Sequence, residues 1–284
     1  MNYAQNSVIL NAALSAIKII AGLLGNSYAL VADGIESASD IFSSLIVWAG
    51  LALSNREAND FYHFGYGKAE SIAAAAASFL LIVAGLGIGI ESYQHIVTPH
   101  QLPKAYTLFV IAIVIVIKEI FYRKAKRLNE KINSAAVSTD AWHQRADAIT
   151  SVAAFIGISI ALIGGIGWEC ADDYAALICA FVIIYNGASL FKSSLTELMD
   201  KAPTQEIVKK IEDAAYKVEG VLFVEQILAR KSGLGYFVDM HVHADPEMSL
   251  QQAHILSGKV KKSIIDSIPH VQRVLIHMEP VENH

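Results

Sequence analysis

The sequence predicts a helical membrane protein in which six transmembrane helices precede a small α/β domain. Three observations lead to this prediction. First, 54% of the 284 residues are hydrophobic and only 17% are charged, against about 25% charged residues in soluble domains. Second, six apolar runs occur before residue 200, each near the ~20 residues that a membrane-spanning helix needs. Third, the residues after 200 have the composition of an ordinary mixed-charge domain.

The apolar runs are the expected membrane spans, and they cover residues 8–26, 29–53, 70–97, 104–122, 140–164 and 174–198. Residues Gly25 to Ser27 separate the first two runs and predict a tight reversal. The amino terminus has no basic region before its apolar run, so we expect a first span rather than a cleavable signal. In the third run, small residues from Ala73 to Ala77 and from Gly85 to Gly89 favour close helix approach.

Basic residues in the loops predict the orientation, because cytoplasmic loops carry an excess of lysine and arginine. The loops after the second, fourth and sixth spans carry such residues at Arg56, Lys68, Arg123, Lys124, Lys126, Arg127, Lys131 and Lys201. Of the alternate loops, one holds Lys104 alone, and the other holds Glu169, Asp172 and Asp173 without a basic residue. Both termini are therefore expected in the cytoplasm.

The tail beyond residue 200 has alternating helix and strand patterns. Apolar spacing predicts a helix, two strands joined by a turn at Ser232 to Gly235, a second helix and a last strand. The expected ranges are 205–218, 221–229, 236–243, 250–265 and 271–277. An α-β-β-α-β order predicts one small sheet with helices on one face. We therefore divide the chain into a transmembrane domain, residues 1–200, and a cytoplasmic domain, residues 201–284.

Composition and motifs exclude several classes of function. The formal net charge of −5 argues against a nucleic-acid partner. Cys170 and Cys179 do not have the number or spacing of a disulfide framework or a zinc motif. The chain has no Walker-type glycine-lysine motif for a nucleotide.

Ionisable residues within the apolar runs are the candidate functional groups. A charge at the centre of a membrane helix costs about 2.5–3.5 kcal/mol on insertion scales, so such residues are functional candidates. Glu36 and Asp40 are four residues apart in the second run, with Asp33 one turn earlier, and His143 and Asp147 are four apart in the fifth. Residues at i and i+4 share a helix face. Each helix therefore offers a pair of metal-type ligands.

These four side chains suit a divalent cation if the second and fifth spans pack together. Zinc takes four such ligands in a tetrahedron, while three carboxylates and one imidazole also suit Mn²⁺, Fe²⁺, Co²⁺ or Cd²⁺. The ligands bind metal only when deprotonated, so protons compete with it, and exchange of metal for protons needs no nucleotide. The alternative is that these polar residues pair with one another in the bundle without a metal.

The paired motifs resemble those of the cation diffusion facilitator family, the zinc-transporter type of metal/proton antiporter, over nearly the whole chain. The resemblance implies a transport site at Glu36, Asp40, His143 and Asp147, with Asp33 as a reserve carboxylate. Glu36 stands where Asp or His is more usual. The family implies a homodimer in the cytoplasmic membrane that exports a divalent cation against protons, zinc first and iron, manganese, cobalt or cadmium as alternatives.

The segment from Phe64 to Glu70 resembles a family motif that follows the second span. Tyr62 and Tyr66 stand where some members have metal-binding histidines, which leaves Asn59, Asp60 and His63 and predicts a weak or absent peripheral site. The resemblance also implies that Lys68 and Asp200 form an interlocking charge pair. The alternative is two ordinary interfacial charges.

Histidines cluster again in the tail. His241 and His243 alternate by two and share one side of a strand, as do His277 and Glu279. The resemblance implies a metallochaperone-like tail with a regulatory metal site at the dimer interface, formed by Glu225, His241, His254, His277 and Glu279. The alternative is that these histidines are solvated or lie in the core.

Two other classes of function remain as alternatives. An intramembrane metalloenzyme would show a metal-dependent reaction without flux, but the chain has no His-Glu-x-x-His motif. A membrane metal sensor would depend on His241 and His277 and not on Asp147.

Overall fold

The computed structural model describes residues 2–54, 56, 58–98, 101–132, 135–233 and 235–281. Within these ranges, the side chains of residues 2–8, 43–44, 47–48, 51, 54, 125, 128–132, 135–144 and 146 lie outside the described set. The chain divides into two compact units: Met1–Leu45 with Ala76–Phe191, and Ile46–Ala75 with Lys192–His284. The domain boundary expected at residue 200 stays a prediction.

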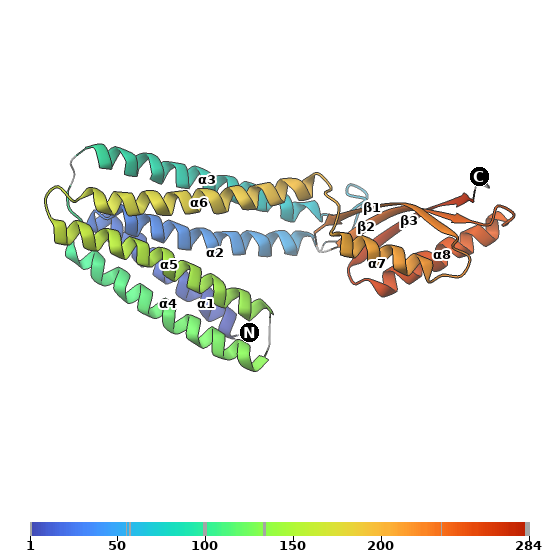
Figure 1. The fold of residues 1–284 in the computed structure, drawn as a ribbon, viewed down its shortest axis with the longest axis horizontal. Helices are drawn as coiled ribbons and strands as arrows, with labels where there is room; N and C mark the ends of the chain where they lie inside the picture. The colour runs from blue at the N-terminus through green and yellow to red at the C-terminus, as the bar shows by residue number, and fades with distance from the viewer. Residues whose placement is uncertain are drawn as a thin grey trace. The chain divides into compact units, whose positions relative to one another are not determined.

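Long helices make up the described chain before residue 200. They are α1 (Asn2–Gly25), α2 (Tyr28–Ser54), α3 (Lys68–Val97), α4 (Ala105–Ile132), α5 (Ala135–Gly164) and α6 (Cys170–Leu198) (Figure 1). Four contain windows long and apolar enough to cross a membrane: Lys68–Val97, Ala105–Lys124, Asp147–Gly164 and Cys170–Leu198. Ile9–Gly25 in α1 is apolar but shorter. The chain is therefore an integral membrane protein, while the number of six spans stays a prediction.

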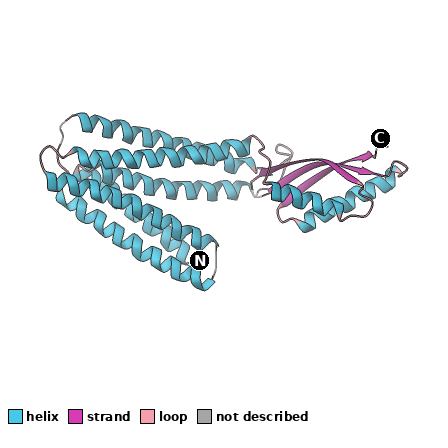
Figure 2. Ribbon diagram, viewed as in Figure 1, coloured by secondary structure: helices cyan, strands magenta, loops and turns pink. Residues whose placement is uncertain are grey.

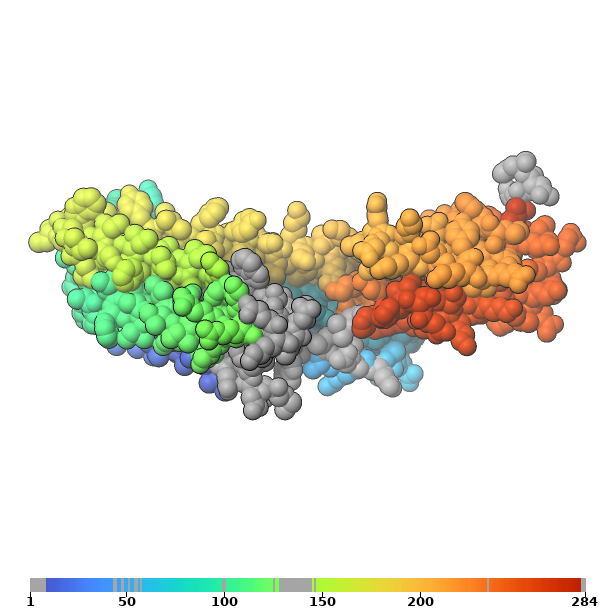
Figure 3. All heavy atoms as spheres, turned by 60° about the horizontal axis from the view of Figure 1, so that its bottom comes forward, coloured from blue at the N-terminus to red at the C-terminus, as the bar shows by residue number. Residues whose placement is uncertain are grey.

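Small side chains let the helices of the first unit approach closely. Ala154 of α5 and Ala176 of α6 are fully buried, and a methyl group at Gly157 would overlap the side chain of Ala175. α4 and α5 lie side by side (Figure 3). Large apolar side chains face outward instead, as at Phe181, which is 71% exposed. Small residues inside and large apolar residues outside are the arrangement that a bilayer favours.

The reversal between α1 and α2 occurs at Asn26. Its φ of 54° lies in the left-handed region, which asparagine tolerates better than most residues because its short side chain bonds locally. The next N–H, from Ser27, donates to the Gly22 carbonyl over 3.0 Å. The turn therefore ends α1 and lets α2 begin within two residues.

The tail in the second unit has the predicted α-β-β-α-β order. Its elements are α7 (Gln205–Tyr216), β1 (Phe223–Ser232), β2 (Gly235–Ala244), α8 (Leu250–Ser267) and β3 (Val271–Pro280) (Figure 2). The sheet order is β1-β2-β3, with β1 antiparallel and β3 parallel to β2. The prediction of a small α/β domain is confirmed, although β1 starts and ends later than expected and β3 continues to Pro280.

Side chains of β2 alternate between a core face and an open face. Val238, Met240 and Val242 are almost completely buried and belong to a core that includes Ile211 of α7 and Ile264 of α8. α7 and α8 lie side by side (Figure 3). The intervening residues of β2, which include both of its histidines, point to the opposite face. The sheet therefore presents its polar face away from the helices.

Candidate metal sites

Glu36 and Asp40 of α2 and Asp147 of α5 lie in the same part of the first unit, although they do not form a group of three ligand atoms within 4.8 Å of one another. Glu36 is 8% exposed and Asp147 is 7% exposed, and the Glu36 carboxylate interacts electrostatically with Asp147, Asp40 and Asp33. Oε2 of Glu36 is buried without a hydrogen-bond partner among the described residues. Glu36 therefore lies near Asp40 and Asp147, while a metal site formed by these carboxylates stays a prediction. The side chain of His143 lies outside the described residues, so its place as the fourth ligand stays a prediction.

Asp33 is engaged by protein groups, and its role as a reserve carboxylate stays a prediction. Its Oδ2 lies 2.7 Å from the ammonium of Lys18 on α1. Ser151 of α5 donates a hydrogen bond to the same carboxylate, with Oγ 2.8 Å from Oδ1 and 3.0 Å from Oδ2. Asp33 therefore connects α1, α2 and α5.

Two buried lysines were missed by the sequence reasoning. The side chains of Lys18 and Lys118 are 0% and 1% exposed. Lys118 Nζ on α4 lies 2.8 Å from Asp147 Oδ2, and both ammonium groups donate to Ser37 Oγ, over 2.7 Å from Lys18 and 3.2 Å from Lys118. Any charge inside an apolar helix is a functional candidate. That criterion, applied to cations as well as to carboxylates, would have found them.

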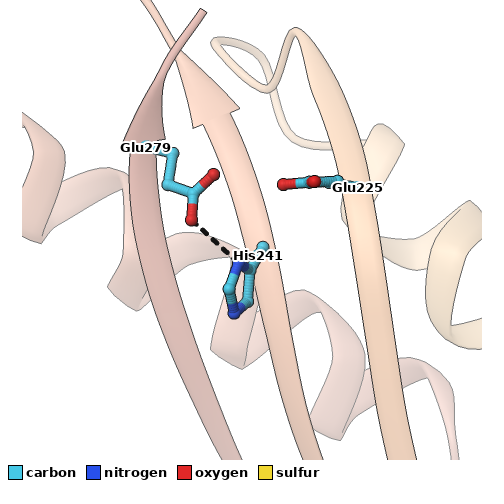
Figure 4. Close-up of side chains that lie close together, drawn as sticks. All are labelled: Glu225, His241 and Glu279. Atoms are coloured by element: carbon cyan, nitrogen blue, oxygen red, sulfur yellow. Dashed lines mark ion pairs between the residues drawn. The ribbon is translucent and has the colours of Figure 1, made fainter.

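A second group of possible ligands lies on the open face of the tail sheet. Glu225 of β1, His241 of β2 and Glu279 of β3 each offer a ligand atom, all within 4.8 Å of one another (Figure 4). His241 Nδ1 is 2.8 Å from Glu279 Oε1, and His277 Nε2 is 3.4 Å from the same oxygen. Glu225 occupies a β-bulge, where the β1–β2 register shifts between Val224 and Gln226. Such a bulge redirects a side chain.

His243 belongs with this group, although it was not among the predicted ligands. Its Nε2 lies 3.2 Å from Glu225 Oε2 and 3.3 Å from Glu279 Oε2. The hydrogen bond from His243 lowers the pKa of the Glu225 carboxyl below its ordinary value. The structure places His254 on α8, exposed and outside the group of close ligand atoms found in the described residues. The tail cluster is therefore Glu225, His241, His243, His277 and Glu279.

The remaining predicted residues lie elsewhere in the second unit. Lys68 Nζ is 3.0 Å from Asp200 Oδ1, and Arg230 approaches Oδ2 of the same carboxylate at 3.7 Å. In the loop before α3, Asn59 donates to the Tyr66 hydroxyl over 2.9 Å, and His63 Nε2 lies 3.1 Å from the Asp60 carbonyl oxygen. No group of three close metal-type ligands occurs in the described part of that loop.

Two models of known protein families match this chain. A family model described as the cation efflux transmembrane domain matches residues 4–199, and one described as the cation efflux protein cytoplasmic domain matches residues 203–281. The chain belongs to the cation diffusion facilitator family. This cation diffusion facilitator chain is thus a transporter for divalent metal cation efflux.

The names of relatives of this facilitator refer to manganese efflux, metal tolerance and magnetosomes. The manganese efflux system protein MneP of Bacillus subtilis (strain 168) is 32% identical over 96% of this chain and 94% of the relative. Metal tolerance protein C1 of Arabidopsis thaliana is 28% identical over 94% of this chain and 59% of the relative. The magnetosome protein MamB of Magnetospirillum gryphiswaldense is 26% identical over 94% and 89% of the two chains. A solved C-terminal domain of MamM is 28% identical over 28% of this chain and 98% of that chain, with a TM-score of 0.27.

Proposed function

We propose that this transporter carries one divalent transition-metal cation at a time between α2 and α5 and returns protons in exchange. The observation that carries the proposal is the buried, unpartnered Oε2 of Glu36 beside the charges of Asp40 and Asp147. An anionic oxygen left without a partner in a membrane interior is costly. A bound cation removes that cost.

Proton exchange follows from the chemistry of the ligands. Carboxylates and the imidazole of His143 bind a metal ion only in their deprotonated forms. A proton that returns to these groups weakens the site and favours metal release. The proton gradient is then sufficient to drive export.

The ligand set favours Mn²⁺ over the zinc expected from the family resemblance. Glu36, Asp40 and Asp147 provide hard carboxylate oxygens, which suit manganese, whereas softer nitrogen and sulfur ligands favour zinc. The 32% identity to a protein named for manganese efflux supports the same preference. We therefore place Mn²⁺ first, with Zn²⁺, Fe²⁺, Co²⁺ and Cd²⁺ as competitors.

The tail is proposed to dimerise the chain and to bind regulatory metal. Support for dimerisation comes from the match of residues 203–281 to the cytoplasmic domain of cation efflux proteins. The tail cluster supplies two carboxylates and three imidazoles on one sheet face, and His254 stays a predicted additional ligand. The same match supports a cytoplasmic tail, and the loop charges support both termini in the cytoplasm. Support for insertion in the cytoplasmic membrane comes from the family match and from the relatives.

The test is a flux assay on the full chain in proteoliposomes, with a metal-sensitive dye and a pH dye inside. Mn²⁺ uptake should be accompanied by proton movement in the opposite direction. Asp147→Ala and Asp40→Ala should abolish both signals, and flux is normalised to the amount of folded protein because Asp147→Ala leaves the buried Lys118 ammonium without its carboxylate. The exposed Asp266→Asn on α8 should behave as wild type. Unchanged flux in Asp147→Ala would refute the proposal. Loss of a metal response only in His241→Ala and His277→Ala would favour a sensor.

A further inference from the structure

The two buried lysines are part of a closed chain of polar contacts across four helices. Lys118 of α4 pairs with Asp147 of α5 at 2.8 Å, and Lys18 of α1 pairs with Asp33 of α2 at 2.7 Å. The hydroxyl oxygen of Ser37 accepts from both ammonium groups. On the other side, Ser151 joins Asp33 to α5, one turn beyond Asp147. Two cations are therefore built into the interior where the predicted carboxylate ligands converge.

The charge of this interior matches a divalent cation. Asp33, Glu36, Asp40 and Asp147 carry four negative charges when ionised, and Lys18 and Lys118 carry two positive charges. When all six groups are ionised, the net charge is −2, which a single divalent ion neutralises. Without the lysines the same carboxylates would hold a divalent ion with twice the required negative charge, and its release would be slow.

The two lysines differ in what they contact. The partner of Lys18 is Asp33, which Ser151 also holds. The partner of Lys118 is Asp147, one of the predicted metal ligands. A metal ion that binds Asp147 through Oδ2 has to displace the Lys118 ammonium, and one that binds through Oδ1 has to share the carboxylate with that positive charge. Ser37 already holds that ammonium at 3.2 Å, so it has an acceptor to remain on when Asp147 is taken by metal.

We propose that Lys118 is a tethered counter-cation that occupies Asp147 in the metal-free transporter and competes with the cargo for it. The inference rests on the proposed transport site. Lys118 acts through Asp147 and is a positioning residue that sets affinity and charge selectivity. A monovalent ion gains little by replacing one positive charge with another, whereas a divalent ion brings a surplus charge. The same competition keeps the divalent ion weakly enough bound to leave.

Kinetics of the full chain in proteoliposomes test this competition. Lys118→Met and Lys118→Gln remove the competing charge and leave the Asp147 carboxylate buried without a cation. Such an uncompensated charge is unfavourable, and a bound metal ion would neutralise it. Their KM for Mn²⁺ should fall about tenfold, and their maximal flux should fall as well because release is slower. Lys118→Arg should retain near-normal values. Lys18→Met changes the net charge by the same amount as Lys118→Met, but it leaves Asp147 paired with Lys118. The KM of Lys18→Met for Mn²⁺ should therefore change less.

The outcomes separate this inference from the proposed function. If the wild type carries Mn²⁺ with dependence on Asp147, but both neutral Lys118 variants show an unchanged or higher KM, the counter-cation role is refuted and transport stands. If flux in the wild type does not depend on Asp147, both fail. A purely structural lysine would lower the amount of folded protein without lowering KM, and that result also refutes the proposal.

Discussion

The carboxylate of Asp172, in the first turn of α6, accepts a hydrogen bond from the backbone N–H of Tyr28, the first residue of α2, over 2.6 Å. The Ala29 N–H reaches the same oxygen at 3.3 Å, and the Ser27 hydroxyl donates to the other oxygen at 2.8 Å. The first N–H groups of a helix have no partner within the helix, and a negative charge there is favourable. Asp172 therefore anchors the helix that carries Glu36 and Asp40.

Removal of this anchor should destabilise the first unit. Asp172→Ala should lower the free energy of unfolding by about 1–2 kcal/mol, the usual cost of a lost N-terminal cap. Asp172→Asn keeps an oxygen acceptor and should lose less. Thermal unfolding in detergent, followed by circular dichroism, measures the difference. Equal melting temperatures for Asp172→Ala and the wild type would contradict this role of Asp172.

The buried pair of Lys18 and Asp33 should behave as one unit. Loss of one partner leaves an uncompensated charge in the interior, so Lys18→Met and Asp33→Asn should each cost about 3–5 kcal/mol. The double variant removes both charges and should cost less than the sum of the single changes. Chemical unfolding of all four proteins completes this double-mutant cycle, and additive costs would argue against coupling.

The side chain at position 36 should determine the ranking of metals. Glu36→His replaces a hard oxygen by an imidazole nitrogen, a ligand that suits zinc. The ratio of Zn²⁺ flux to Mn²⁺ flux should rise, with both still dependent on Asp147. Glu36→Asp keeps the oxygen chemistry and should not raise the ratio. A ratio that is the same in all three proteins would place metal discrimination elsewhere.

The contact between His243 and Glu225 should make tail stability depend on pH. The hydrogen bond from His243 holds the pKa of Glu225 below its ordinary value. Its stabilising effect is therefore present above the unfolded pKa of glutamate, about 4.3, and is lost as the pH falls through the lower folded value. His243→Ala removes this effect. Its melting temperature should therefore differ most from that of the wild type near neutral pH, and least at acidic pH below the folded pKa of Glu225.

A matched variant separates the carboxylate from the histidine. Glu225→Gln should reproduce the loss near neutral pH, because it also removes the contact between a carboxylate and His243. Melting curves of the full chain between pH 3 and 7, without added metal, compare the three proteins. A difference that persists unchanged at the acidic end would refute the assignment to Glu225.

The sequence predicted best what local spacing determines. The order of elements in the tail followed from apolar periodicity, and the structure confirms it. The i and i+4 spacing of Glu36 and Asp40 predicted a polar face, and Asp147 of α5 interacts electrostatically with Glu36, while the ligand role of these residues stays a prediction. Such patterns are visible because both members of a pair lie on the same helix or strand.

Contacts between distant elements were harder to foresee. Lys118 was missed because a lysine near the end of an apolar run is usually able to extend its ammonium to water, and only the packing of α4 against α5 shows that it reaches Asp147 instead. His243 shares a strand face with His241, but the register that sets it opposite Glu279 on β3 is not encoded in β2 alone. His254 was expected from family resemblance, and its position on α8 has no local signal for a ligand role.

The register of the tail sheet constrains how homologous chains can change. His241 lies opposite His277, and His243 lies opposite Glu279, along a parallel pair of strands. A shift of one residue between these strands would exchange the open face for the core face, and Ile276 and Met278 would replace the ligands. Evolution can therefore alter the identity of each ligand by substitution, whereas an insertion or deletion within β3 before His277 would move both His277 and Glu279 off the open face in one step.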